Sequence, residues 1–246
     1  MSEIEQPPLK KVKNTVPKMK KMKKEVDPFS QIGTYQQVQE KDIEALLAEH
    51  NLTVEEVTND YALVSKLYKK REKEAVAKYN RYVENVEILA ITSQGDGMGL
   101  IDSVFENKTK QVIIVPFGLV GDVVNAQIHT TQKMAVIADL VDVIKESSMR
   151  DNSLINCKYF GICQGCNYQH TSYDNQMDLK KKTIVNAYKY FAPSIFKGIM
   201  DSDKFMDVVQ SPNKYKYRTK ITPHASLPVI LKKNALEAIE KSEPIK

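Results

Sequence analysis

The fold of this chain is decided by residues 112–124, which read VIIVPFGLVGDVV. Four β-branched residues run up to Pro116, and the glycine turn GLVGD then leads into a second β-branched run. β-branched residues favour strands, and glycine beside an acidic residue favours a tight turn. Further runs of strand length flank this stretch, namely VEILAI before it and AVIADLVDVI after it. Short strands joined by tight turns predict a small antiparallel, OB-like β-barrel across residues 82–150.

Two elements of this region carry a family resemblance. The first is the glycine-rich segment DGMGLI (96–101), and the second is VPFGLVGDVV (115–124). The glycine segment lacks the lysine and the following helix of a phosphate-binding loop, so it predicts a hairpin. Together the two elements resemble the TRAM domain, a small RNA-binding barrel that precedes the catalytic part of several RNA-modifying enzymes.

The composition is that of a folded protein. Hydrophobic residues make up 42% of the 246 residues and charged residues 27%, which is enough apolar material for a core. Apolar runs such as Val112–Val115 are too short to span a bilayer, so no membrane association is expected. With three cysteines and no apolar leader segment, we expect a reducing, intracellular compartment and no disulfide framework.

The net charge of +5 is unevenly distributed along the chain. Residues 1–25 hold eight lysines against three glutamates, and residues 26–150 hold 13 basic against 19 acidic residues. Residues 151–246 hold 15 basic against nine acidic residues. Two basic regions around a mildly acidic middle fit a polyanionic partner, and solvated lysines without a partner are the alternative.

Residues 1–35 are predicted to form a disordered basic tail, because four prolines and a lysine repeat leave little apolar material. The clusters PPLKKVK and PKMKKMKK have the arrangement of a bipartite nuclear import signal, and an RNA-contacting arm is the alternative. We therefore expect the protein in the nucleus, the cytoplasm or both.

Residues 36–81 lack glycine and proline and are predicted to be helical. Apolar residues recur at three- and four-residue intervals, which predicts helices at about 39–50 and 54–80. Thr53 followed by Glu56 forms a capping-box sequence at the start of the second, charge-rich helix. This segment either packs on the next domain or binds a partner.

All three cysteines follow the predicted barrel, as Cys157, Cys163 and Cys166 in a C-x5-C-x2-C arrangement. Three thiolates on one glycine-containing loop can converge on a metal ion or an iron–sulfur cluster. His170 would complete a Cys3His set for zinc, whereas a cluster would need a fourth thiolate. Buried structural cysteines are the alternative.

The region after the cysteines predicts a helix and a cationic strand. Thr171 or Ser172 would cap the helix, whose apolar stripe is expected to pack and consists of Met177, Ile184, Tyr188 and Phe191. Residues 214–221 alternate, which predicts a strand with one packed face and one cationic face. We expect this cationic face to bind RNA phosphates, with a solvated face as the alternative. Its residues are Lys214, Lys216, Arg218 and Lys220.

A TRAM-like barrel followed by C-x5-C-x2-C-x3-H is similar to the RNA uracil-C5 methyltransferase family, and the lysine-rich tail is most like its eukaryotic tRNA members. The resemblance covers residues 82–222. It implies that Cys157, Cys163 and Cys166 hold a [4Fe–4S] cluster together with a fourth cysteine farther on, which this sequence lacks. It also implies tRNA as partner and methylation of C5 of a T-loop uridine with S-adenosylmethionine.

The same resemblance gives the expected domain organisation. Residues 151–246 would be an incomplete central domain that opens an RNA-binding sheet. In the family, a separate domain supplies the methyl-donor pocket, a nucleophilic cysteine and a carboxylate base. No matching residues are found here, so we expect this chain to lack the catalytic domain and name no catalytic residue. The alternative is a stand-alone RNA-binding protein with a small cysteine-rich metal site and no catalysis.

Overall fold

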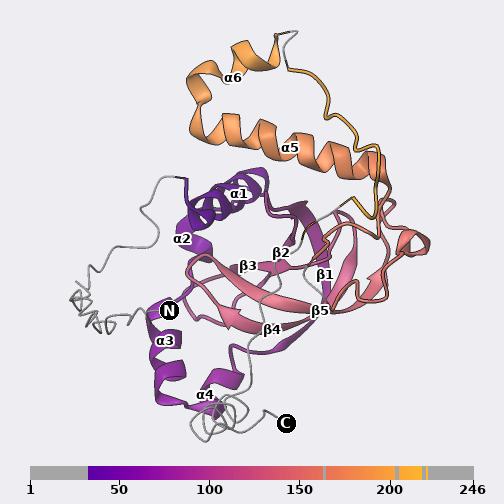
Figure 1. The fold of residues 1–246 in the computed structure, drawn as a ribbon. Coiled ribbons are helices and arrows are strands. Elements are labelled where there is room, and N and C mark those ends of the chain that lie inside the picture. Colours follow the sequence, from indigo (N-terminus) through magenta and orange to yellow (C-terminus); the bar gives the residue numbers. More distant parts are fainter. Residues whose placement is uncertain (1–32, 163–164, 203–204, 218–219, 221–246) are drawn as a thin grey trace, which may run out of the picture. The chain divides into compact units, whose positions relative to one another are not determined.

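A closed barrel of five strands forms the core of the first of two units (Figure 1). The computed structural model describes residues 33–162, 165–202, 205–217 and 220, and the two units divide after Phe205. The prediction of an α+β protein with a small barrel is confirmed. Its strands are β1 (Tyr82–Ile91), β2 (Gly97–Asp102), β3 (Lys110–Val115), β4 (Val123–Thr131) and β5 (Ala135–Lys145).

The strands follow the order β1-β2-β3-β5-β4, and pairing between β4 and β1 closes the barrel. β3 and β5 run parallel, with Ile113 opposite Val136, and the other neighbouring strands run antiparallel. The prediction of an antiparallel barrel is therefore wrong for this one pair of strands. Closure pairs both edges of the sheet, which removes the exposed backbone groups of an open edge. The interior is filled from all five strands, by residues that include Ile88, Ile101, Val115, Val124 and Val136.

The uninterrupted apolar run in β3 is explained by burial on both faces. Ile113 and Val115 belong to the barrel interior, while Val112 and Ile114 belong to a second apolar cluster with α1 (Tyr35–Glu49). Because side chains alternate across a strand, a continuous apolar run needs cover on both sides. α1 provides the outer cover with the buried side chains of Ile43, Leu46 and Leu47.

The predicted glycine hairpin joins β1 to β2. The backbone N–H of Thr92 donates to the carbonyl of Asp96 at 2.8 Å, and Gly95 takes a φ of +103° that favours glycine. Gly99 permits a close approach of the two strands, because a Cβ there would lie 2.4 Å from the carbonyl oxygen of Glu87. The hairpin prediction is therefore confirmed.

The described residues 33–81 contain four helices rather than the predicted two. α1 is followed by α2 (Val54–Val57), α3 (Tyr61–Lys70) and α4 (Lys73–Ala77). The capping box is present, since the Thr53 N–H donates to the Glu56 carboxylate at 2.7 Å and the Glu56 N–H donates to Thr53 Oγ1 at 3.4 Å.

The single helix predicted over 54–80 is wrong because bonds to the barrel interrupt it. The Asn59 N–H donates to the carbonyl of Lys133 at 2.7 Å, and Gln111 Nε2 donates to Asn59 Oδ1 at 2.7 Å. A second break follows at Arg71, whose φ of +58° ends α3. Burial of α1 against the barrel agrees with the alternative in which this segment packs on its neighbour.

In the described residues after the barrel, a short 3-10 helix at Asn152–Leu154 is followed by two α-helices, α5 (Tyr173–Phe191) and α6 (Pro193–Met200). Ser172 caps α5 as predicted, by accepting from the N–H of Asn175 at 3.2 Å. The prediction that the apolar stripe of α5 is packed is confirmed only in part. Met177 is buried, but Ile184 is 47% exposed and Phe191 is 39% exposed.

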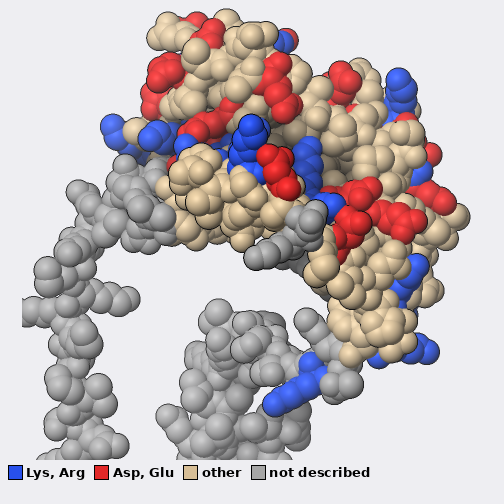
Figure 2. Space-filling model, turned by 90° about the horizontal axis from the view of Figure 1, so that it is seen from above, with Lys and Arg blue, Asp and Glu red and all other residues tan. Residues whose placement is uncertain are grey.

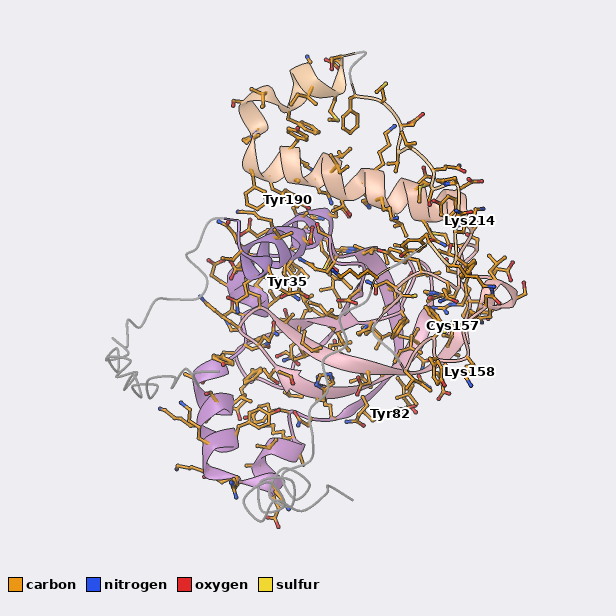
Figure 3. All side chains as sticks on the ribbon, in the orientation of Figure 1. Tyr35, Tyr82, Cys157, Lys158, Tyr190 and Lys214 are labelled. Atoms are coloured by element: carbon orange, nitrogen blue, oxygen red, sulfur yellow. The ribbon has the colours of Figure 1, made fainter. Side chains whose placement is uncertain are left out.

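α5 is also held against α1 near its C-terminal end. Tyr190 reaches towards α1 (Figure 3) and hydrogen-bonds the carboxylate of Asp42, which also accepts from the N–H of Ser93 at 2.7 Å. Burial raises the pKa of Asp42, and burial beside that carboxylate raises the pKa of Tyr190. These contacts tie α1, the β1–β2 hairpin and α5 together.

Some predicted features lie outside the described residues. These are most of the tail predicted for 1–35, whose last residue Tyr35 begins α1, and all of the chain from 221 onward. No described helix is long and apolar enough to cross a membrane.

Candidate nucleic-acid interface and cysteine loop

A buried ion pair joins the segment after β5 to the loop between β3 and β4. The Asp122 side chain is fully buried, and its carboxylate accepts from the N–H of Leu119 at 2.7 Å and of Ser147 at 2.8 Å. Arg150 donates to the same carboxylate through Nη2 at 2.6 Å and to the carbonyl of Phe117 at 2.7 Å. Burial raises the pKa of Asp122, but the bonds from Arg150 and the backbone outweigh it and hold the pKa below its usual value.

His170 fills the space beside this pair. Its side chain is fully buried, Nε2 lies 3.0 Å from the carbonyl oxygen of Phe117, and its ring packs on Phe160 with a centroid distance of 5.1 Å. Phe160 also packs edge-on against Phe117. Burial, together with the positive charge of Arg150, lowers the pKa of His170 to about 4. The imidazole is therefore neutral at pH 7 and donates from Nε2 to the carbonyl.

The cysteine loop is attached to the barrel at a second point, the β1–β2 hairpin. Asn167 Nδ2 donates to the carbonyl of Gln94 at 2.9 Å, and Tyr168 covers Gly95 so closely that a Cβ there would lie 2.7 Å from the phenol oxygen. Gln169 Oε1 accepts from the N–H of Cys157 at 3.1 Å and closes the base of the loop.

The predicted metal ligands are only partly described. Cys157, which Figure 3 labels, is half-buried, Cys166 is exposed, both are free thiols, and Cys163 lies outside the described residues. Among the residues that the structure describes, no three His, Cys, Asp or Glu side chains come together as a metal site. The zinc set with His170 does not fit, because Cys157, Cys166 and His170 are not brought together and the imidazole is packed between the barrel and Phe160.

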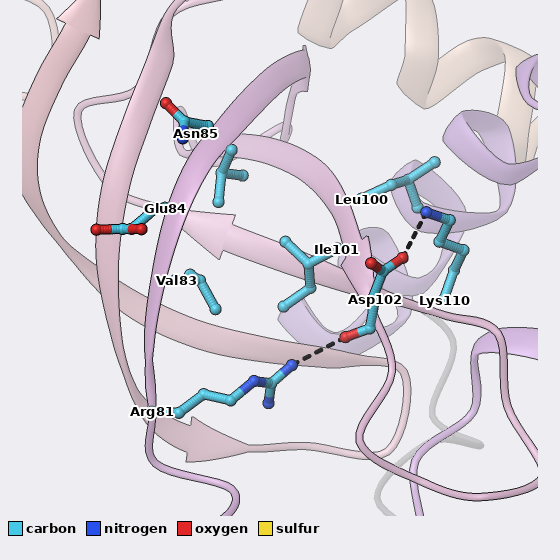
Figure 4. Close-up of a pocket in the computed structure, with 9 residues that line it drawn as sticks. Arg81, Val83, Glu84, Asn85, Leu100, Ile101, Asp102 and Lys110 are labelled. Atoms are coloured by element: carbon cyan, nitrogen blue, oxygen red, sulfur yellow. Dashed lines mark hydrogen bonds and ion pairs between the residues drawn. The ribbon is translucent and has the colours of Figure 1, made fainter.

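An open hollow lies between the start of β1 and the end of β2 (Figure 4), where the two strands are not paired. Its volume is about 340 Å³. Arg81 Nη2 donates to the carbonyl of Asp102 at 2.9 Å, and Lys110 Nζ lies 2.7 Å from the Asp102 carboxylate. The bond from Lys110 lowers the pKa of Asp102. The hollow is lined by two basic side chains, Arg81 and Lys110, and by two acidic ones, Glu84 and Asp102, so its charge is balanced.

The predicted cationic strand at 214–221 is not a strand in its described part. Residues 211–217 form bends, and Lys216 has a φ of +56°, outside the extended region. Tyr215 and Tyr217, expected to form the packed face, are 47% and 64% exposed. Lys214, Lys216 and Lys220 are exposed, whereas Arg218 is not described. An alternating pattern forms a strand only beside a partner strand, and no described residue pairs with this segment.

Charge is mixed over much of the surface. On the face shown in Figure 2, lysine and arginine side chains are interspersed with aspartate and glutamate. A phosphate-binding surface is therefore better sought in local clusters than in one continuous basic face.

Comparison with known proteins agrees with this geometry. A family model described as TRAM domain matches residues 77–141, which span the barrel from α4 into β5. The chain is 43% identical over 213 residues to the tRNA (uracil(54)-C(5))-methyltransferase of Saccharomyces cerevisiae, covering 86% of this chain and 33% of the relative. This chain is related to the RNA uracil-C5 methyltransferases. The enzyme of the same name from Schizosaccharomyces pombe is 37% identical over 178 residues, 71% of this chain and 32% of the relative.

The relationship extends to bacteria. A 23S rRNA (uracil(1939)-C(5))-methyltransferase of Francisella tularensis is 29% identical over 145 residues, which is 58% of this chain and 29% of the relative. The chain thus spans about a third of the length of these curated relatives.

Sequence analysis missed several residues that build the junction between barrel and loop. Phe117 binds both Arg150 and His170 through its carbonyl oxygen, and its φ of +65° marks a turn that its sequence did not signal. Asp122 was recognised only as the acidic member of a turn, although the GLVGD sequence places it directly after Gly121. A buried acidic residue in an apolar stretch is the signal that could have revealed the ion pair.

Proposed function

We propose that this chain supplies the RNA-docking part of a tRNA uracil-C5 methyltransferase, which methylates C5 of a T-loop uridine with S-adenosylmethionine as methyl donor. The observation that carries the proposal is the closed five-stranded barrel, which matches a TRAM domain and lies within 213 residues of 43% identity to a tRNA (uracil(54)-C(5))-methyltransferase.

The described residues support docking by charge and stacking. Lys214, Lys216 and Lys220 are exposed beside Tyr215 and Tyr217, whose rings are open to solvent. Lysines can neutralise phosphates while exposed aromatic rings stack on unpaired bases, and both contacts suit a loop of RNA. A uridine must leave the stack before C5 can be modified, so the docking part has to hold the loop in an open form.

Cys157, Cys163 and Cys166 are proposed to hold a metal centre, with an iron–sulfur cluster as the form that the family resemblance favours. The free thiols of Cys157 and Cys166 support this, as does the Gln169 side chain that fixes the base of the loop. A cluster would stiffen the loop that packs on the barrel and leave the RNA surfaces in place. Anaerobic purification should yield iron with a broad visible charge-transfer absorption, and a triple Cys→Ser change should abolish it. If the purified protein contains no metal and the triple Cys→Ser change leaves its stability unaltered, the proposed cluster is wrong.

Binding of tRNA by the full chain tests the docking proposal. We expect Lys216→Ala with Arg218→Ala to weaken binding and to flatten the slope of log affinity against log salt by about one to two units. Lys41→Ala with Lys145→Ala removes the same charge elsewhere and should leave the slope unchanged. If the unaltered chain does not bind tRNA, the proposed function is wrong. If only the slope stays unchanged, the 214–220 segment is solvated and docking lies on the barrel.

Methyl transfer by this chain alone is not expected. All three cysteines lie within 157–166, so no further cysteine can serve as the nucleophile that the resemblance implies. The measurement is incorporation of labelled methyl from S-adenosylmethionine into tRNA, with the full-length Saccharomyces cerevisiae enzyme as positive control. Transfer to C5 of uridine by the 246-residue chain would contradict the proposed division of labour.

A further inference from the structure

The helices α3 and α4 concentrate positive charge in a region that is otherwise acidic. Residues 61–81 hold seven basic and two acidic residues, whereas the rest of 26–150 holds six basic and 17 acidic ones. Six of the seven basic side chains are exposed on α3, on α4, in the turn between them or directly after α4, and we call them the α3–α4 patch. They are Lys66, Lys69, Lys70, Arg71, Lys73 and Lys78.

The patch is not neutralised by its own helices. Among the described residues, its one ion pair joins Lys70 to Glu72 at 3.6 Å, with both side chains well exposed. Lys66 and Lys70 are four residues apart on α3, where like charges repel. Lys69 and Lys70 are favoured at the C-terminal end of a helix, but this does not explain Lys73, which begins α4.

The backbone of the patch is attached to the barrel at Tyr68, whose hydroxyl lies 3.3 Å from the carbonyl oxygen of His129 on β4. Val64 on α3 is fully buried, and Tyr68 donates to Asn80 Oδ1 at 2.5 Å. After α4, the Tyr79 ring stacks on Phe105 with a centroid distance of 5.3 Å. The backbone of α3 and α4 thus lies beside the barrel (Figure 1), so it is positioned before a partner binds.

Neighbouring groups indicate an RNA partner. The chain leaves α4 into Arg81 and Tyr82, and Arg81 lines the hollow between β1 and β2 while Tyr82 is 44% exposed. Tyr61, which opens α3, is 48% exposed. Exposed aromatic rings among cations suit stacking on bases and contact with phosphates.

We infer that the α3–α4 patch is a second RNA-backbone contact surface, which extends the barrel's docking surface and, for the most part, lies outside the 77–141 range that matches a TRAM domain. This inference rests on the proposed function, because it takes tRNA as the ligand. Phosphate contacts carry no sequence information, so the patch should raise affinity equally for tRNA and for an unrelated RNA hairpin.

The test compares three full-length proteins for binding to tRNA and to that hairpin across a salt series. In the patch variant, Lys66→Gln, Lys69→Gln and Lys73→Gln remove charge with little change in helix propensity. The control variant carries Lys41→Gln, Lys108→Gln and Lys145→Gln, an equal charge change scattered over α1, the β2–β3 loop and the end of β5. The melting temperature of each variant reports whether it is folded.

We expect the patch variant to bind both RNAs about tenfold or more weaker at low salt and to flatten the salt slope by about two to three units. The control variant should match the unaltered chain. If the unaltered chain binds tRNA and the patch variant keeps its affinity and slope, the inference is overturned while the proposed function stands. If the unaltered chain binds no RNA, both fail.

Lysine modification gives an independent readout on the unaltered protein. An amine-reactive acetylating reagent should label Lys66, Lys69 and Lys73 more slowly when saturating tRNA is bound, while Lys145 labels at the same rate. Equal labelling of the patch lysines with and without tRNA would overturn the inference even if the mutations weakened binding.

Discussion

The barrel and the α5–α6 pair have equally regular apolar patterns but use them differently. In the barrel, Ile113 and Val124 are fully buried, because every strand faces another strand or α1. On α5 and α6, Ile184 and Ile195 remain about half exposed, at 47% and 53%. A closed sheet supplies its own partner surfaces, whereas a helix pair buries its stripe only where another element covers it. Periodicity therefore predicts an element better than it predicts burial.

The largest effect is expected at the junction that anchors the barrel's end. Asp122→Ala leaves Arg150 buried without its partner and leaves two backbone N–H groups without an acceptor. The free energy of unfolding should therefore fall by about 3–5 kcal/mol. Asp102→Ala removes an exposed partner of Lys110 and should change the urea midpoint little. Equal effects of the two substitutions would show that the Asp122 pair does not hold the junction.

Isoleucines on the two regions should differ in their contribution to stability. Ile113→Ala removes a fully buried side chain from the barrel interior and should cost about 2–5 kcal/mol of unfolding free energy. Ile184→Ala makes the same chemical change on α5 and should cost far less, because that side chain is half exposed. Urea denaturation of both variants is the measurement, and a large loss with Ile184→Ala would mean that the α5 stripe is covered.

Glycines distinguish the same two regions. Gly99→Ala would place a Cβ 2.4 Å from the Glu87 carbonyl oxygen, and the forced strand shift should cost about 1–3 kcal/mol. Gly198 on α6 has open space around it, so Gly198→Ala should stabilise the protein by about 0.5–1 kcal/mol through helix propensity. The melting temperature should fall in Gly99→Ala and rise in Gly198→Ala. An unchanged melting temperature in Gly99→Ala would contradict the close approach of the two strands.

A pH dependence is expected at the barrel–loop junction. The pKa of His170 is held at about 4, below its ordinary value of 6.5, so as pH falls through this window the unfolded chain binds a proton that the folded chain does not. As the pH falls from 6.5 towards 4, the free energy of unfolding should decrease by about 1.4 kcal/mol per pH unit because of His170. His170→Gln should remove that slope, and His50→Gln, at the exposed end of α1, should keep it. An unchanged slope in His170→Gln would show that His170 is solvated.

Local signals predicted the elements of the first unit well. Thr53 and Glu56 formed the expected capping box, Ser172 capped α5, and the glycine hairpin formed as its turn residues required. These features depend on contacts within a few residues, which sequence displays directly. Predictions failed where a distant partner decided the outcome, as at Asn59, whose bonds to Gln111 and to the backbone of Lys133 break a helix that local propensity favours.

The candidate site shows the same division. The sequence identified the cysteines as a loop and His170 as a possible ligand, but the fold placed the imidazole between Phe117 and Phe160, where burial keeps it neutral. The cationic segment at 214–217 had a strand pattern without a described partner strand, so its tyrosines are exposed. The sequence shows the α3–α4 patch only as a charge-rich segment. The tertiary structure places its two helices beside the barrel.

The sequence by itself determined the barrel strands, the turns between them and the helix caps, because β-branched runs, glycines and capping side chains act on their own neighbours. Only the tertiary structure decided the pairing of β1 with β4, the burial of Asp122 and Arg150, and the cover that α1 gives to β3. These depend on residues far apart in the chain, whose hydrogen bonds and apolar contacts form only when closure brings them together.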